Sequence, residues 1–231
     1  MRKISSALLF ASLLATFFSP LTAQVNVGVR AGSHWANVKG TEATDNLTKS
    51  FDAIRSNEFA VFAEIPLFAG LSIQPELAYT TKGFAYDQDA NVNLFNIDLP
   101  IGAHAESRFR YVEAPILAKY AFGEKAFRAY VAAGPTFGYA TKGKIVTMAN
   151  LLIDLKVGET PINLDGNNFN RFEVGAAVGG GVELDINFAK LFADVRYKHG
   201  FTEVYDIPVV EEKVSHKGFN LNVGFAIPIG Q

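Results

Sequence analysis

Apolar and polar residues alternate along most of this chain, and this alternation restricts the possible folds more than any other feature. In residues 24–35, Val25, Val27, Val29 and Ala31 fall on one parity, while polar residues and glycines fall on the other. A period of two is typical of a β-strand with one apolar face. The pattern recurs in 59–67, 71–83, 108–122, 127–133, 172–184, 191–197 and 219–229. The sequence therefore predicts an all-β fold of eight strands.

The links between the predicted strands are alternately short and long. The short links are 68–70, 122–125 and 185–190, and the long polar stretches are 37–57, 86–106, 142–170 and 202–216. In an up-and-down meander all short links lie at one rim, and transmembrane barrels have short periplasmic turns and longer extracellular loops. We therefore expect an eight-stranded antiparallel up-and-down transmembrane β-barrel, with both termini at the periplasmic rim.

The direction of the apolar face distinguishes a membrane barrel from a soluble one. An eight-stranded barrel has an interior just wide enough for side chains to fill, and an Arg or Lys at the bilayer midplane costs about 2–4 kcal/mol. We therefore expect the apolar face to contact lipid and the polar face to line the lumen. The lumenal residues expected to pair are Glu76, Lys82, Glu113, Lys119, Arg128, Glu173, Glu183, Asp194 and Arg196. The alternative is a soluble, lipocalin-like barrel with an apolar lumen.

Aromatic residues near the ends of the predicted strands are candidates for two girdles at the membrane–water interfaces. They are Trp35, Tyr79, Tyr120, Phe122, Phe127, Tyr139, Phe172, Phe192, Tyr197 and Phe219.

The first 23 residues have the three-part pattern of a secretory signal peptide. Arg2 and Lys3 precede an apolar run over 7–18, and a small residue, Ala23, stands before the expected cleavage site. The run is shorter than the roughly 20 residues of a transmembrane helix, and without cysteine there is no lipoprotein anchor or disulfide framework. We therefore expect a signal peptide over 1–23, an outer-membrane β-barrel domain over 24–231, and export to the cell outer membrane.

Charge and motifs give little support for nucleic-acid binding or nucleotide chemistry. The formal net charge of −2 provides no basic footprint for nucleic acid. Residues 138–144 have the spacing of a phosphate-binding loop, but Ile145 stands where a Ser or Thr would hold magnesium. We interpret this segment as the start of a loop that carries glycine. The glycines of 179–181 are interpreted as small lumen-facing or strand-bending positions.

The four histidines are the remaining candidates for chemistry. None stands at metal-ligand spacing from another. A lipid-modifying barrel enzyme would use His199 as a base with Ser215 or Glu203, an alternative that no spacing in the sequence requires. We therefore predict no catalytic, cofactor-binding or metal-binding residue, and expect a protein that is not an enzyme and needs no cofactor.

Glu76 and Glu113 are a notable carboxylate pair, because both lie on the polar faces of strands expected to be neighbours. Paired carboxylates can serve acid–base chemistry. Here Lys82, Lys119 and Arg196 are available as counter-ions. We therefore predict a lumenal salt-bridge network that fills and rigidifies the barrel.

Five segments carry a resemblance to a known family. They are 74–79 (QPELAY) running to Lys82-Gly83, 111–120 (YVEAPILAKY), 133–135 (AGP), 179–183 (GGGVE) and 196–200 (RYKHG). In this order they resemble the outer-membrane β-barrel proteins often labelled porin family or PorT-like, with the architecture of small OmpA and OmpX barrels. Many such barrels end on an aromatic residue, whereas this chain ends Ile229-Gly230-Gln231.

The resemblance implies contacts with outer-membrane lipid and with the barrel assembly machinery. It also implies a possible transport-related role, as a narrow pore or as a component of a secretion apparatus. Eight strands leave too little bore for a water-filled channel once charged side chains fill it. The function we expect is therefore a structural or interaction barrel, whose extracellular loops contact ligands or extracellular or envelope protein partners.

Overall fold

The structure is a computed structural model, and it describes residues 24–39, 51–94, 97–124, 126–150, 154–164, 169–202 and 215–229. The predicted signal peptide lies outside the described residues. Within them, no helix has the length and apolar character needed to cross a membrane.

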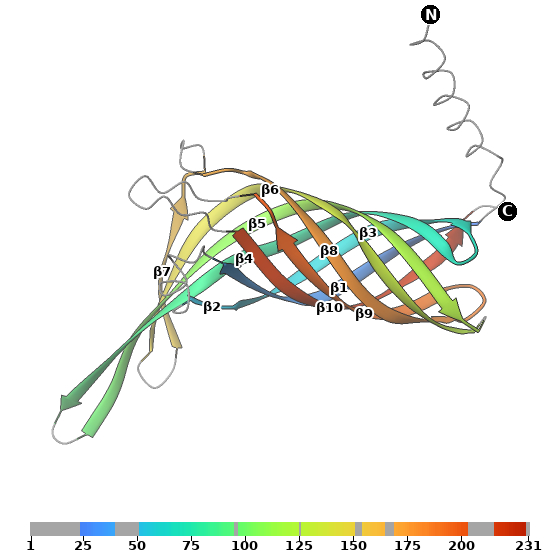
Figure 1. The fold of residues 1–231 in the computed structure, drawn as a ribbon. Coiled ribbons are helices and arrows are strands. Elements are labelled where there is room, and N and C mark those ends of the chain that lie inside the picture. The colour runs from blue at the N-terminus through green and yellow to red at the C-terminus, as the bar shows by residue number, and fades with distance from the viewer. Residues whose placement is uncertain are drawn as a thin grey trace, which may run out of the picture.

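The described residues form one sheet of ten strands (Figure 1). They are β1 (Val25–Lys39), β2 (Phe51–Asp52), β3 (Ile54–Phe68), β4 (Leu71–Leu94), β5 (Ile97–Gly123), β6 (Phe127–Asn150), β7 (Asp154–Ile162), β8 (Phe172–Asp185), β9 (Lys190–Gly200) and β10 (Ser215–Ile229). Eight of them close on themselves in the order β1, β3, β4, β5, β6, β8, β9, β10, and every pairing is antiparallel. The predicted closed eight-stranded barrel is confirmed.

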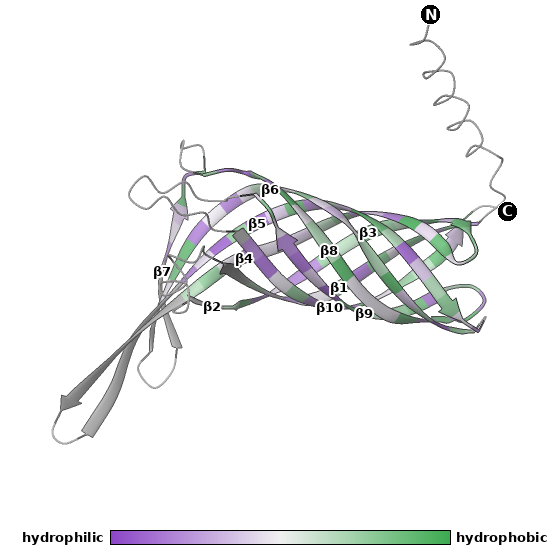
Figure 2. Ribbon diagram, in the orientation of Figure 1, coloured by the Kyte–Doolittle hydropathy of each residue, from purple (hydrophilic) through white to green (hydrophobic). Residues whose placement is uncertain are grey.

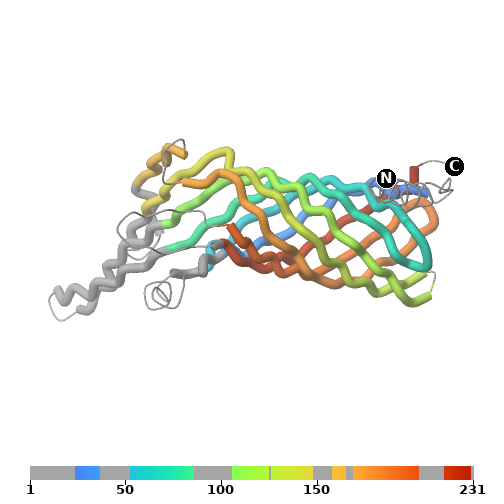
Figure 3. The backbone as a smooth tube through the Cα atoms, turned by 45° about the horizontal axis from the view of Figure 1, so that its top comes forward, coloured from blue at the N-terminus to red at the C-terminus, as the bar shows by residue number. Residues whose placement is uncertain are grey.

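The first and last strands close the barrel along their whole length. The pairing of β1 with β10 runs from Val25 opposite Ile229 to Lys39 opposite Ser215. Figure 3 shows these strands, blue and red, side by side at one end of the tube. The short links Ala69–Gly70 and 186–189 lie at this end, which we call the turn end. The opposite end is called the loop end.

Several strands continue farther than the sequence predicted. β4 and β5 stay paired out to Leu94 opposite Ile97, and β7 pairs with β6 beyond the barrel. The predicted loops 86–106 and 142–170 therefore contain long stretches of sheet, which extend from the loop end (Figure 1). The prediction was wrong here because backbone pairing needs no apolar face once a strand has left the bilayer.

The two faces of the barrel have the predicted polarity. Outward-facing side chains such as Val61, Leu77 and Val223 are 52%, 55% and 60% exposed, whereas Arg30, Glu58 and Glu113 of the lumen are 2% exposed or less. Apolar and polar residues alternate along the strands in Figure 2. The lipocalin-like alternative is therefore wrong, since charged side chains occupy the interior.

Most of the predicted girdle residues face outward. Trp35, Tyr79, Tyr120, Phe122, Phe127, Tyr139, Phe172 and Phe219 are exposed, and Tyr197 packs on Phe219 with ring centroids 4.9 Å apart. Phe192 is the exception, because its parity on β9 is that of the lumenal Asp194. It packs edge-on against Phe62 at 5.5 Å and helps to fill the lumen.

Gly179 is one of the small lumen-facing positions that the sequence predicted. A Cβ at this position would lie 2.4 Å from the Val195 carbonyl oxygen and 2.8 Å from Cγ of Arg196. We expect Gly179→Val to lower the free energy of unfolding by about 1–3 kcal/mol, because it overpacks the lumen. Urea unfolding in lipid vesicles checks this. Gly158→Val is the matched control, since no atom lies within 4 Å of a Cβ there, and an equal loss in both variants would contradict the packing explanation.

Candidate functional site

Many ionisable side chains meet in the lumen of the described barrel, and Arg30 lies at the centre of their network. Its guanidinium contacts the Glu58 carboxylate at 2.7 Å and the Glu76 carboxylate at 2.8 Å. It also donates a hydrogen bond of 3.0 Å to Oδ1 of Asn222. These residues come from β1, β3, β4 and β10, so a single arginine ties four strands together across the interior.

The network continues from Glu76 toward the turn end. The other Glu76 oxygen accepts a hydrogen bond of 2.7 Å from Arg196, which also pairs with Asp194 at 2.8 Å. Asp194 accepts further hydrogen bonds of 2.7 Å each from the Tyr130 hydroxyl and the Asn222 amide. Each carboxylate in this part therefore has more than one donor.

A second branch runs from Glu58 toward the loop end. Lys198 bridges Glu58 at 2.7 Å and Glu113 at 2.6 Å, and Lys82 bridges Glu113 at 2.6 Å and Glu173 at 2.5 Å. Nδ1 of His216 lies 2.9 Å from the second Glu173 oxygen and ends the branch. Acidic and basic groups thus alternate from Asp194 to His216, and all eight barrel strands contribute a side chain to the network.

A smaller cluster fills the lumen near the turn end. Lys119 pairs with Glu64 at 2.8 Å and with Glu183 at 2.6 Å. Arg128 approaches Glu183 at 2.6 Å, and Lys190 approaches Glu64 at 3.3 Å. Lys119 also lies 4.4 Å from the centre of the Tyr130 ring, which connects this cluster to the central network.

The described side chains of the lumen are balanced in charge. The carboxylates Glu58, Glu64, Glu76, Glu113, Glu173, Glu183 and Asp194 face as many Lys and Arg side chains: Arg30, Lys82, Lys119, Arg128, Lys190, Arg196 and Lys198. Two cavities between these side chains have volumes of about 10 Å³ each, room for about one water molecule apiece. Removing so many charges from water is costly unless every one is paired, and here they are.

The predicted network is confirmed, with one change of partner. Glu76 and Glu113 do not form an acid–base pair, because each is held between two cations. As predicted, Arg196 is a counter-ion of Glu76 and Lys82 is a counter-ion of Glu113. Lys119 pairs with Glu64 and Glu183 instead. We did not anticipate the central roles of Arg30, Glu58 and Lys198. Their parity marks them as lumenal, but the sequence does not indicate which partners the barrel brings within reach.

The structure gives no support to the catalytic alternative. His199 faces outward between Tyr197 and Phe201, with its ring 6.2 and 5.5 Å from theirs. Glu203 and the Ser215 side chain lie outside the described residues. Within the described part of the chain, no cluster of three or more His, Asp or Glu is placed to hold a metal ion.

The segment with phosphate-loop spacing is neither a loop nor the start of one. Residues 138–144 lie inside β6, paired with β5 from Glu113 to Arg108. Gly143 faces inward against Phe109, whose ring would lie 2.9 Å from an added Cβ. The glycine therefore makes room for a lumenal aromatic ring.

A closed antiparallel barrel with an apolar exterior and a charged lumen defines a transmembrane β-barrel of the outer-membrane type. The family model described as outer membrane protein beta-barrel domain matches residues 16–206. The chain belongs to this family.

The solved structures to which this chain is similar include the following three. The attachment invasion locus protein Ail of Yersinia pestis is 13% identical, with 88% of this chain and 99% of that chain covered and a TM-score of 0.43. Neisserial surface protein A is 13% identical, with 88% and 97% covered and a TM-score of 0.43. OprG of Pseudomonas aeruginosa is 13% identical, with 90% and 97% covered and a TM-score of 0.43. A search of curated proteins found no match.

Proposed function

We propose that this protein is a non-conducting outer-membrane barrel that serves as an anchor, without catalysis, and whose loop end contacts ligands or protein partners. The observation that carries the proposal is the filled lumen. The alternating charges from Asp194 to His216 occupy the described interior, and two cavities among the lumenal side chains have room for about one water each. A solute would have to displace paired charges in order to pass.

The loop end is the part of the molecule available for contacts. Short turns of such barrels face the periplasm and longer connections face outward, so we assign the loop end to the cell exterior. The paired extensions of β4 with β5 and of β6 with β7 continue the sheet there. Export by the signal peptide of 1–23 and insertion by the barrel assembly machinery belong to the same proposal.

The transport alternative is tested by conductance in planar lipid bilayers. We expect the purified full chain to give no discrete current steps, because ion pairs close the lumen. A porin of 16 or more strands, which has an aqueous channel, is the positive control for the bilayer. Reproducible steps whose size changes in Arg196→Ala would contradict the proposal and favour a narrow pore.

The interaction role is tested by site-specific photo-cross-linking in intact cells. A photoreactive residue at the exposed Thr147 near the loop end should capture a partner, whereas one at the exposed Ala69 of the β3–β4 turn should not capture the same partner. A partner captured only from Ala69, or from neither position, would count against the loop end as the contact surface.

A further inference from the structure

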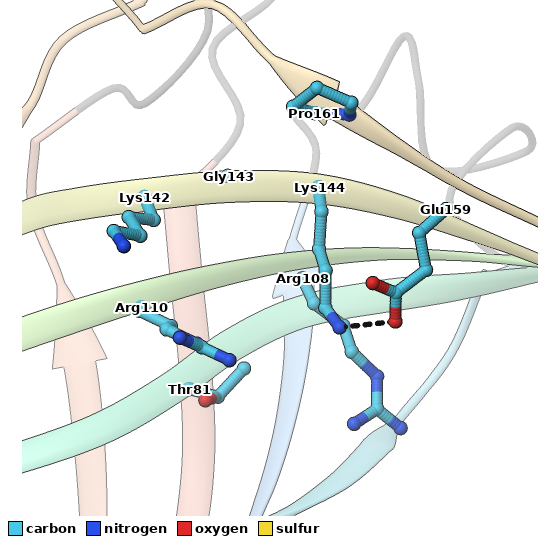
Figure 4. Close-up of a pocket in the computed structure, with 8 residues that line it drawn as sticks. All are labelled: Thr81, Arg108, Arg110, Lys142, Gly143, Lys144, Glu159 and Pro161. Carbon is cyan, nitrogen blue, oxygen red and sulfur yellow. Dashed lines mark hydrogen bonds and ion pairs between the residues drawn. The ribbon is translucent and has the colours of Figure 1, made fainter.

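Four basic side chains surround a hollow of about 340 Å³ at the loop end of the barrel. Arg108 and Arg110 lie on β5, and Lys142 and Lys144 lie on β6. Thr81 of β4 and Glu159 of β7 complete the lining together with Gly143 and Pro161 (Figure 4). The hollow thus brings together four strands, and we call these four cations the basic cluster.

The basic cluster is on the outside of the barrel. Phe109 and Tyr111 are fully buried, so Arg110 between them points the opposite way, on the same face as the exposed Val112. Lys142 lies directly opposite Arg110, and Lys144 lies directly opposite Arg108. Residues opposite each other in antiparallel strands share a face of the sheet, so all four cations point away from the lumen.

The charge of the basic cluster is only partly neutralised. Glu106 approaches Arg108 at 2.5 Å, and Glu159 approaches Lys144 at 2.6 Å. Within the described part of the chain, no carboxylate pairs with Arg110 or Lys142. Like charges directly opposite each other destabilise a sheet, so an anion bound between them would relieve the repulsion.

The depth of the basic cluster matches the lipid headgroups. Tyr79, Val112 and Tyr139 form one cross-strand row, and the next outward-facing row toward the loop end contains Thr81, Arg110 and Lys142. Two residues of a tilted strand rise by about 5 Å along the membrane normal. Tyrosines mark the interface of such barrels, so Arg110 and Lys142 reach the level of the headgroups just beyond it.

An apolar depression on the outer surface lies next to the basic cluster, on the side toward the middle of the membrane. It has a volume of about 680 Å³ and is lined by side chains that include Phe59, Val61, Leu77, Tyr79, Val112 and Phe225. Tyr79 and Val112 belong both to this depression and to the row next to the cations. A single amphiphile therefore has a place for an anionic head and for an apolar tail on one continuous surface.

From this arrangement we infer a binding site for a phosphate-bearing lipid of the outer leaflet. Its phosphate binds between Arg110 and Lys142, and its acyl chains lie in the apolar depression. An arginine guanidinium offers a planar pair of donors to phosphate oxygens, and a lysine adds a point charge. This site goes beyond the proposed function, and it depends only on the barrel standing in a membrane.

The site is tested by measuring how tightly the full chain in detergent micelles binds a fluorescent phosphorylated glycolipid and the same lipid without its phosphates. Arg110→Ala/Lys142→Ala should weaken binding of the phosphorylated lipid about thirtyfold, since each surface cation contributes roughly fivefold. Binding of the dephosphorylated lipid should not change. Both side chains are exposed, and the heat-dependent gel shift of a folded barrel verifies that the variant folds.

Arg55→Ala/Lys217→Ala is the matched control, because it removes the same charge from outward-facing positions of β3 and β10 near the loop end. It should change binding less than threefold. An equal loss in both double variants would overturn the site, and so would an unchanged affinity of Arg110→Ala/Lys142→Ala. Displacement of the lipid by millimolar inorganic phosphate would assign the cluster to a soluble anion and overturn the lipid assignment.

Discussion

Glu76→Ala is expected to lower the free energy of unfolding by about 3–5 kcal/mol, the range for removing one partner of a buried ion pair. The Glu76 carboxylate is shared between Arg30 at 2.8 Å and Arg196 at 2.7 Å, and these side chains are almost completely buried. Without it, two buried guanidiniums each lose a charged acceptor. Urea unfolding in lipid vesicles, followed by the fluorescence of Trp35, measures the loss.

Glu159→Ala is the control for this prediction. Glu159 pairs with Lys144 at 2.6 Å, but its side chain is 38% exposed, and exposed ion pairs contribute only about 0–1 kcal/mol. The loss in the free energy of unfolding of Glu76→Gln should lie between those of the two alanine variants, because the amide oxygen keeps an acceptor near the guanidiniums. A loss in Glu76→Ala no larger than in Glu159→Ala would show that the lumenal network does not stabilise the barrel.

Val61→Arg is expected to destabilise the barrel by about 2–4 kcal/mol in a bilayer, the cost of an arginine at the midplane on the lipid face of a barrel. Val61 faces outward, is 52% exposed and lies between Val29 of β1 and Leu77 of β4. Its neighbours offer the guanidinium no acceptor side chain. Unfolding in vesicles of fixed thickness gives the measurement.

Phe68→Arg provides the comparison, since Phe68 ends β3 beside the short turn. Near the interface the cost should fall to about 0–1 kcal/mol. A barrel whose outside faced water would tolerate Val61→Arg within about 0.5 kcal/mol, as exposed positions usually do. Equal, small losses at the two positions would therefore contradict a lipid-facing exterior.

The barrel itself could be predicted from the sequence, because each strand has one face against lipid and one in the lumen. That requirement leaves a period of two in every membrane-spanning segment. Phe192 shows that the parity of a residue along its strand, and not its residue type, indicates which face of the barrel it occupies. Its type suggested an interfacial residue, but the lumenal Asp194 lies two positions away on the same face, and packing against Phe62 in the lumen decided its side.

The ends of the strands and the partners in the lumen could not be predicted in the same way. Beyond the bilayer no lipid-facing side requires apolar residues, so alternation stops while backbone pairing continues to Leu94 and Ile97. The partners of Arg30 lie 28, 46 and 192 positions away in the chain. Their proximity follows from the register and closure of the barrel, and no local pattern encodes it.

Cross-linking of the seam between β1 and β10 tests the closed outer-membrane barrel most directly. Ala31 lies opposite Val223 across this seam, and residues directly opposite in antiparallel strands have Cα atoms about 4.5–5.5 Å apart, within reach of a disulfide. The chain has no cysteine of its own, so Ala31→Cys/Val223→Cys introduces the only thiols. A closed barrel predicts an intramolecular cross-link in the outer-membrane fraction, and a much weaker one for Ala31→Cys with the offset Leu221→Cys. Two free thiols in a protein recovered from the soluble periplasm would contradict both the closure and the membrane location.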